Sequence, residues 1–269
     1  MNRYAFFYQM LFVVLLFFPT FCLGKNVTIC YENKHNAPFV FSPNDAEHDP
    51  KGLAINIIRS AAKKANLPIQ FISRPWLRCQ QMVKNNQAQA LFAMIKTPER
   101  TPLFKFPTNK DHALMTADYG LFIKKDGILD NKDTLADITS VDNRLDVRKY
   151  KKYLKFGLSG PIGYVVNDIL LKQKILSNFE YTVNTGLVAV AENRLDGYVI
   201  SKMVGLNKIN EHGLSNSIYW SNIILTSNEW YIPFNNEYYQ QHEKQIEKFW
   251  FEIGHVKTKE IERYFSEFD

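Results

Sequence analysis

Residues 52–72, GLAINIIRSAAKKANLPIQFI, have the pattern of a helix followed by a strand. After Gly52, apolar residues recur at the spacing of one helical face; they are Ala54, Ile57, Ile58, Ala61, Ala62 and Ala65. Asn66 and Pro68 are residue types that end helices. The run at residues 69–72 then predicts a short strand. A helix followed at once by a strand is typical of an α/β protein.

Further strands and a second helix flank this stretch. Residues 26–31 alternate in polarity and predict a strand. Pro75 suits the first turn of a helix in which Trp76, Cys79 and Val83 share one face. Residues 90–95 are apolar except at the ends, which is typical of a strand buried on both sides of a parallel sheet. This alternation of strands and helices predicts an α/β fold with right-handed crossovers.

After Pro107 the sequence pattern changes from alternating short strands and helices, and a second α/β unit follows. We expect a long strand at residues 113–124 and then a charged, irregular stretch at 126–152. The second unit would follow, with strands at 153–158 and 197–200 and, between them, helices at 164–176 and 187–194. A strand at 230–234 and helices at 237–253 and 259–265 follow, with Gly254 as a left-handed cap. We therefore predict one lobe from residues 25–112 plus 227–269 and another from residues 113–226.

Composition excludes several classes of protein. The 269 residues are 46% hydrophobic and 22% charged, which excludes a disordered chain and a polytopic membrane protein. The net charge of +6 is spread along the chain, so no nucleic-acid partner is expected. The acidic stretch at residues 45–49 lacks the pattern of a calcium loop, and no serine lies in a nucleophile elbow. We expect no catalytic residue, metal or cofactor.

The N-terminus has the pattern of a secretory signal peptide. Arg3 precedes an apolar stretch at residues 5–18, and small Gly24 follows Pro19. We predict cleavage after about Gly24 and a periplasmic protein; a retained membrane anchor is the alternative. The mature chain would keep two cysteines, Cys30 and Cys79, which in an oxidising compartment form a candidate disulfide. Two buried free thiols are the alternative.

The segment Thr97-Pro98-Glu99-Arg100 combines signals of a helix start with a cation, which is unfavourable there. A hydroxyl cap, a first-position proline and an early acid all favour a helix start. Arg100 opposes the helix dipole there. An anionic ligand, held by free backbone amides and a two-pronged guanidinium, would explain it; a solvated arginine is the alternative.

The ordered set Gly52-Leu53, Arg74-Pro75-Trp76-Leu77-Arg78 and Thr97-Pro98-Glu99-Arg100 resembles the periplasmic solute-binding proteins of family 3, the amino-acid-binding type. The resemblance extends over residues 27–268 and is strongest at 52–100. It implies the type II periplasmic-binding-protein fold, with two crossover strands as a hinge between two lobes that close on a solute. In such a first lobe, the elements of Cys30 and Cys79 are neighbours.

The resemblance also implies a ligand-binding site. Thr97 and Arg100 match the residues that hold a ligand carboxylate, and Phe39 matches an aromatic residue that packs on the ligand. Trp76 lies near the same cleft, with core packing as the alternative role. The turn Ser159-Gly160-Pro161-Ile162-Gly163 matches one that offers backbone amides to the solute.

Some positions depart from the family pattern. Ser201 stands where amino-acid binders commonly carry an aspartate for the ligand ammonium, and Pro161 replaces a threonine. Ala93 and Ile95 replace small polar contacts. The site thus keeps its anion clamp and loses its obvious cation partner.

We expect an exported monomer that captures a small, carboxylate-bearing, amino-acid-like solute for an inner-membrane ABC permease. A sensory binding protein for a membrane signalling partner is the alternative, and a dehydratase-like enzyme on the same fold is a weaker one. The position after the strand at 197–200 is the most open to a catalytic acid or base, and Ser201 there argues against catalysis.

Overall fold

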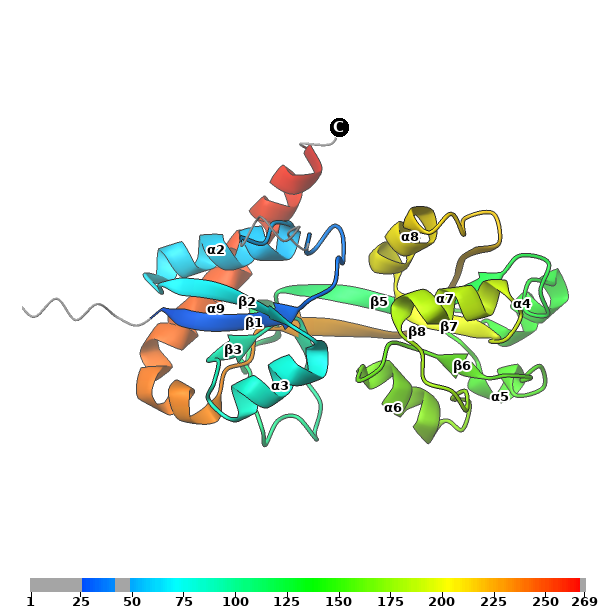
Figure 1. Ribbon diagram of the computed structural model, residues 1–269, viewed down its shortest axis with the longest axis horizontal. Coiled ribbons are helices and arrows are strands. Elements are labelled where there is room, and N and C mark those ends of the chain that lie inside the picture. The colour runs from blue at the N-terminus through cyan, green and yellow to red at the C-terminus, as the bar shows by residue number, and fades with distance from the viewer. Residues whose placement is uncertain (1–25, 42–48, 267–269) are drawn as a thin grey trace, which may run out of the picture.

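The first lobe is built on a three-stranded parallel sheet. The computed structural model describes residues 26–41 and 49–266. Its first sheet has the order β2-β1-β3, with β1 at Val27–Glu32, β2 at Ile69–Arg74 and β3 at Ala90–Leu91. Helix α2, Leu53–Ala65, and helix α3, Trp76–Lys84, connect these strands (Figure 1). The predicted α/β fold is confirmed.

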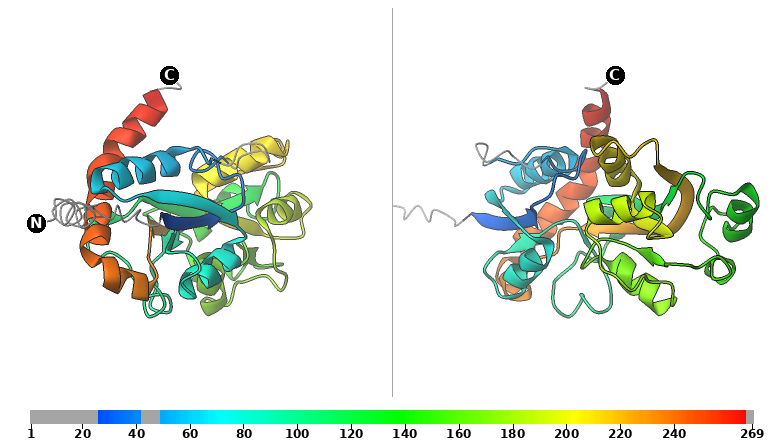
Figure 2. Two further views of the ribbon diagram at one scale, coloured as in Figure 1. Left: turned by 60° about the vertical axis from the view of Figure 1, so that its left-hand side comes forward. Right: turned by 45° about the vertical axis from the view of Figure 1, so that its right-hand side comes forward.

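Helices cover both faces of this sheet. Helix α2 packs with α9, Asn236–Ser266, on one face, and α3 covers the other (Figure 2). The expected apolar face of α2 is buried throughout. Asn66 takes a left-handed conformation with φ of 54° and ends α2 where the sequence predicted. Trp76, Cys79 and Val83 form the buried face of α3, as their spacing indicated.

A five-stranded sheet extends from the first lobe into the second. Its order is β4-β8-β5-β7-β6, with β4 at Met94–Ile95, β5 at Met115–Lys124, β6 at Leu158–Ser159, β7 at Gly197–Ser201 and β8 at Ile218–Tyr231. The antiparallel pairing of β5 with β8 runs from Met115 opposite Trp230 to Lys124 opposite Ile218. The register shifts beside Gly120, where a Cβ atom would lie 2.4 Å from the carbonyl oxygen of Ile223.

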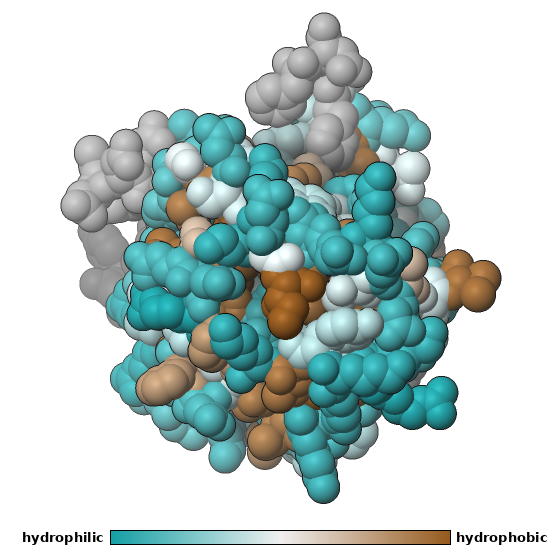
Figure 3. Space-filling view, turned by 90° about the vertical axis from the view of Figure 1, so that its right-hand side faces the viewer, coloured by the Kyte–Doolittle hydropathy of each residue, from teal (hydrophilic) through white to brown (hydrophobic). Residues whose placement is uncertain are grey.

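Helices also sandwich the sheet of the second lobe. Helix α7, Val183–Ala191, and helix α8, Lys202–Glu211, pack on one face, and α6, Val165–Lys172, packs on the other. Two short helices, α4 at Lys132–Ile138 and α5 at Val147–Tyr150, and the 3₁₀ turn η1 at Lys110–His112 complete the described chain. The free end of the second lobe is mostly hydrophilic, with apolar side chains exposed near its centre (Figure 3).

Several expected elements differ in the first half. Residues 90–95 are buried as predicted except for Ala93, but they form two short strands in different sheets. Residues 98–103 form consecutive turns rather than a helix, because Pro102 has no N–H to donate to the carbonyl of Pro98. The helix-dipole argument for Arg100 therefore rested on a helix that does not form.

The second half departs further from the expected elements. Residues 126–152 contain α4 and α5, and the strand expected at 153–158 is only Leu158–Ser159. Of the strand expected at 230–234, only residues 230–231 are extended, as the end of the long β8. Helix α8 was not predicted. The C-terminal helices are continuous through Gly254, so no left-handed cap exists there, and α9 is instead kinked at His242, where φ is −129°. Gly254 instead allows close packing, because a Cβ atom would lie 3.0 Å from the carbonyl oxygen of Asp111.

Two expectations are not tested by these elements. The lobe boundaries after residues 112 and 226 stay a prediction, since β5 and β8 pass through both lobes. The signal peptide lies outside the described residues. Within residues 26–41 and 49–266, no helix combines the length and apolar character that crossing a bilayer requires.

A disulfide joins the two cysteines of the predicted mature chain. Cys30 at the buried centre of β1 bonds Cys79 on α3, and their Cα atoms lie 5.5 Å apart. This distance is normal for a disulfide and confirms the predicted pair. The bond ties the sheet to the helix that covers it, within a core cluster that also contains Trp76 and Leu91.

Replacing both cysteines, Cys30→Ala with Cys79→Ala, should lower the free energy of unfolding by about 2–4 kcal/mol, because the bond closes a long loop. Denaturant unfolding measures this difference. A thiol reductant should lower the stability of the wild type and leave the double variant unchanged. Equal stability of the variant and the oxidised wild type would contradict the expectation.

Candidate functional site

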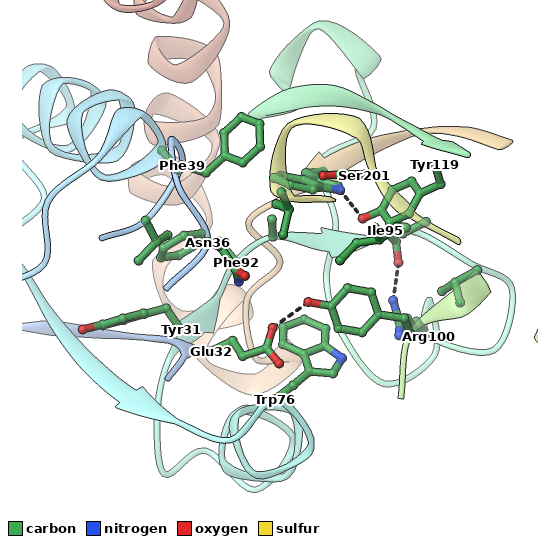
Figure 4. Close-up of a pocket in the computed structure, with 18 residues that line it drawn as sticks. Tyr31, Glu32, Asn36, Phe39, Trp76, Phe92, Ile95, Arg100, Tyr119 and Ser201 are labelled. Carbon is green, nitrogen blue, oxygen red and sulfur yellow. Dashed lines mark hydrogen bonds between the residues drawn. The ribbon is translucent and has the colours of Figure 1, made fainter. Parts of the chain in front are cut away.

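A cavity that is partly open to solvent lies where the two lobes meet. Both lobes contribute to its walls: Asn36, Trp76 and Arg100 come from the first lobe, and Tyr164, Ser201 and Val204 from the second (Figure 4). Its walls are rich in aromatic rings, namely Tyr31, Phe39, Trp76, Phe92, Tyr119, Tyr164 and Trp230. Such a chamber suits a small solute with an apolar body and a few polar groups.

The guanidinium of Arg100 is half-buried at this cavity and held by carbonyl groups. It donates to the carbonyl oxygen of Ile95 at 3.0 Å and to that of Gly163, in the other lobe, at 3.4 Å. Its carbon lies 6.0 Å from the centre of the Trp76 ring. Within the described chain, no carboxylate forms an ion pair with it. Its remaining N–H groups can therefore receive an anion.

Burial also makes the positive charge of the Arg100 guanidinium energetically costly. Loss of hydration lowers its pKa, while the charges of Asp168, Tyr119 and Glu99 act in the opposite direction. A carboxylate ligand would compensate this buried charge directly.

The structure separates the predicted site residues into two groups. Those that line the cavity are Phe39, Trp76, Ala93, Ile95, Arg100 and Ser201. The others, Thr97, Gly160, Pro161 and Ile162, lie outside its lining. The hydroxyl of Thr97 accepts from the backbone N–H of Arg100 at 3.3 Å, so it orders the turn that carries Arg100. The N–H of Gly160 is already bonded to the side chain of Asn167 at 2.7 Å.

The cavity contains a carboxylate that the sequence did not reveal. Glu32, at the end of β1, is buried and accepts a hydrogen bond of 2.6 Å from the hydroxyl of Tyr164 in the second lobe. Its other oxygen accepts from the ammonium of Lys34, also at 2.6 Å. Burial first, and then the charge of Glu32, raise the pKa of Tyr164 well above its usual value, so this tyrosine stays a neutral donor. Glu32 was not among the site residues expected from the sequence.

Two residues on neighbouring strands complete the polar lining. Tyr119 on β5 pairs directly with Ser201 on β7. The hydroxyl of Tyr119 accepts from the indole N–H of Trp230 at 2.8 Å, and the hydroxyl of Ser201 has no partner in the described structure. Tyr119 was missed because it lies in a largely buried strand, and only the strand pairing brings it to the site.

Direct hydrogen bonds hold the two lobes together around the cavity. The indole N–H of Trp76 donates to the carbonyl of Gly163 at 3.2 Å, the carbonyl that Arg100 also contacts. The side chain of Asn207 donates to the carbonyl of Ala37 at 2.8 Å. The cavity is therefore described in a state in which the lobes touch. Within the described residues, no cluster of side chains has the composition of a metal site.

Comparisons with known proteins agree with this architecture. The sequence model of the bacterial extracellular solute-binding proteins, family 3, matches residues 27–155. A histidine kinase sensor domain with similarity to periplasmic binding proteins is 12% identical, with a TM-score of 0.67 over 87% of this chain and 91% of that one. A mutant of ArgBP from T. maritima is 13% identical, with a TM-score of 0.65 over 90% and 95%.

A further solved structure is the GluR0 ligand-binding core from Nostoc punctiforme in complex with L-glutamate. It is 16% identical, with a TM-score of 0.63 over 89% of this chain and 99% of that one. At these low identities, the structural similarity shows a shared fold, which is the two-lobe type II periplasmic-binding-protein fold. A search of curated proteins finds no significant match.

Replacing Tyr164 with phenylalanine should favour separation of the lobes. The variant loses a hydrogen bond between the lobes to a charged group, worth about 1.5–3 kcal/mol, so the ratio of closed to open molecules should fall about tenfold or more. Single-molecule energy transfer between dyes on the two lobes measures this ratio. Tyr153→Phe, which removes a tyrosine–carboxylate bond to Asp137 within the second lobe, is the control. Identical distance distributions for the two variants would refute the role of Tyr164.

Proposed function

Because the chain, through residues 27–155, is a member of the bacterial extracellular solute-binding proteins of family 3, we propose that it captures a small solute with a carboxylate group in the cavity between its lobes. The observation that carries this proposal is the half-buried guanidinium of Arg100, which faces the cavity without a carboxylate partner in the described chain. Thr97 orders the turn beneath it, and Trp76 and Phe39 pack against the body of the solute.

The captured solute is handed to an inner-membrane ABC permease by an exported, monomeric protein. The Cys30–Cys79 disulfide supports export, because such bonds persist in oxidising compartments. The predicted signal peptide supports it independently. The alternative, a binding protein that reports the solute to a membrane signalling partner, is supported by the likeness to a histidine kinase sensor domain.

Binding is favoured over catalysis by the state of the polar groups at the cavity. A general base needs an available lone pair near the substrate. Each oxygen of Glu32 already accepts a short hydrogen bond. Ser201 has no described hydrogen-bond partner that could act as its base. Glu32 is the one carboxylate among the described lining residues, so a dehydratase-like activity would have to use its remaining lone pairs or displace one of these two contacts.

Arg100→Ala should weaken binding of the solute that co-purifies with the protein by about 2–5 kcal/mol, as when one partner of a buried charge pair is removed. Arg100→Lys should also bind poorly, because an ammonium cannot reproduce the two-pronged guanidinium contact. Native mass spectrometry identifies the solute, and calorimetry with the stripped protein measures its affinity.

Arg148→Ala is the matched control, since Arg148 is exposed on α5 and lies outside the cavity lining. It should bind as the wild type does. An unchanged affinity of Arg100→Ala for the co-purified solute would refute the anion clamp.

A further inference from the structure

The corner of the cavity at the end of β7 is rich in hydrogen-bond donors. Ser201 is 3% exposed and occupies the N-cap of α8, yet its side chain caps no backbone N–H, and its hydroxyl has no partner within the described chain. The first N–H groups of a helix lack partners within the helix, and they form its positive end. Val204, in the first turn of α8, lines the cavity together with Ser201.

Tyr119 adds a second hydroxyl beside this corner. Tyr119 and Ser201 are direct partners in the antiparallel pairing of β5 with β7, so their side chains lie on the same face of the sheet. The oxygen of Tyr119 accepts from Trp230, which leaves its own hydrogen free to donate to a ligand. Burial raises the pKa of Tyr119 far above its usual value, so the hydroxyl stays protonated.

The one carboxylate among the described residues of this cavity is already engaged by an ammonium group and a tyrosine. Glu32 is the single acidic residue among the described residues that line it. Its charge is compensated by Lys34, and both of its oxygens accept hydrogen bonds of 2.6 Å. An ammonium at the corner of Ser201 would also face the positive end of α8, which repels it. Arg100 is the charged residue of the described lining that forms no ion pair, so the cavity suits a net anion better than a zwitterion.

We propose that the solute is a 2-oxo or 2-hydroxy carboxylic acid with an apolar body, and that Ser201 is the residue that selects a neutral oxygen over an ammonium group. The carboxylate binds Arg100, the neighbouring oxygen binds the hydroxyls of Ser201 and Tyr119, and the apolar body packs between the aromatic walls (Figure 4). This inference rests on the proposed function and specifies its solute.

Matched sets of acids that differ only at the second carbon test the inference. One set is phenylpyruvate, phenyllactate and phenylalanine; the other is 4-methyl-2-oxopentanoate, 2-hydroxy-4-methylpentanoate and leucine. Calorimetry with the solute-stripped protein should give a Kd at least tenfold smaller for an oxo or hydroxy acid than for its amino acid. Tighter or equal binding of the amino acids, or no binding of any member, overturns the inference.

Substitutions at position 201 test the role of that residue. Ser201→Ala should weaken binding of the preferred oxygen-bearing acid five- to tenfold, and Ser201→Asp should reverse the preference toward the amino acid. Ser177→Ala removes another buried serine that is outside the cavity lining, and it should change neither. Circular dichroism checks that each variant folds. An unchanged preference in Ser201→Asp overturns the selecting role.

The two proposals can fail separately. If the co-purified solute requires Arg100 but the protein shows no preference for oxygen-bearing acids, the inference about Ser201 is wrong and the proposed function stands. If binding of the co-purified solute does not depend on Arg100, the proposed anion clamp itself is wrong.

Discussion

The antiparallel pairing of β5 with β8 links the two lobes and positions much of the cavity lining. These strands pass from one lobe into the other, and β8 also pairs with β4 in the first lobe. Their pairing places Tyr119 and Trp230 on the cavity wall and sets the position of β7, which ends at Ser201. Because a shift of register by one residue would turn every side chain to the other face, this pairing determines which residues reach the solute.

Contact between the lobes and the geometry of the site are coupled at one carbonyl group. The oxygen of Gly163 accepts from Trp76 and from Arg100, both in the first lobe. Gly163 has a φ of 77°, and a Cβ atom there would lie 2.8 Å from a side-chain carbon of Leu77. The left-handed backbone conformation is what favours glycine here, because the side chain of Leu77 can move aside. The second lobe thereby orients the arginine that we propose binds the solute.

The charges of the cavity are arranged asymmetrically. The acid, Glu32, is compensated by Lys34 and by a neutral tyrosine, whereas the guanidinium of Arg100 contacts only carbonyl groups and an aromatic ring in the described chain. Buried charges are costly unless they are paired. An anion that pairs with Arg100 can therefore contribute most to the free energy of ligand binding. Glu32, which is already compensated, stabilises contact between the lobes.

Elements that depend on local periodicity and residue type could be predicted from the sequence. The apolar face of α2 and its end at Asn66, the buried residues of α3, and the candidate pair Cys30 and Cys79 could be read from spacing and residue type. The resemblance to a family placed Arg100, Phe39 and Trp76 near one cleft, and the structure brings them to one cavity.

The remaining features depend on contacts between residues distant in sequence, so they emerge only when the chain is folded. Glu32 and Tyr164 meet from different lobes, and Tyr119 reaches Ser201 through strand pairing, so no local pattern signals either pair. The split of residues 90–95 into β3 and β4 follows from two different partner strands, since β3 pairs with β1 and β4 with β8. The continuation of α9 through Gly254 follows from its close packing on Asp111.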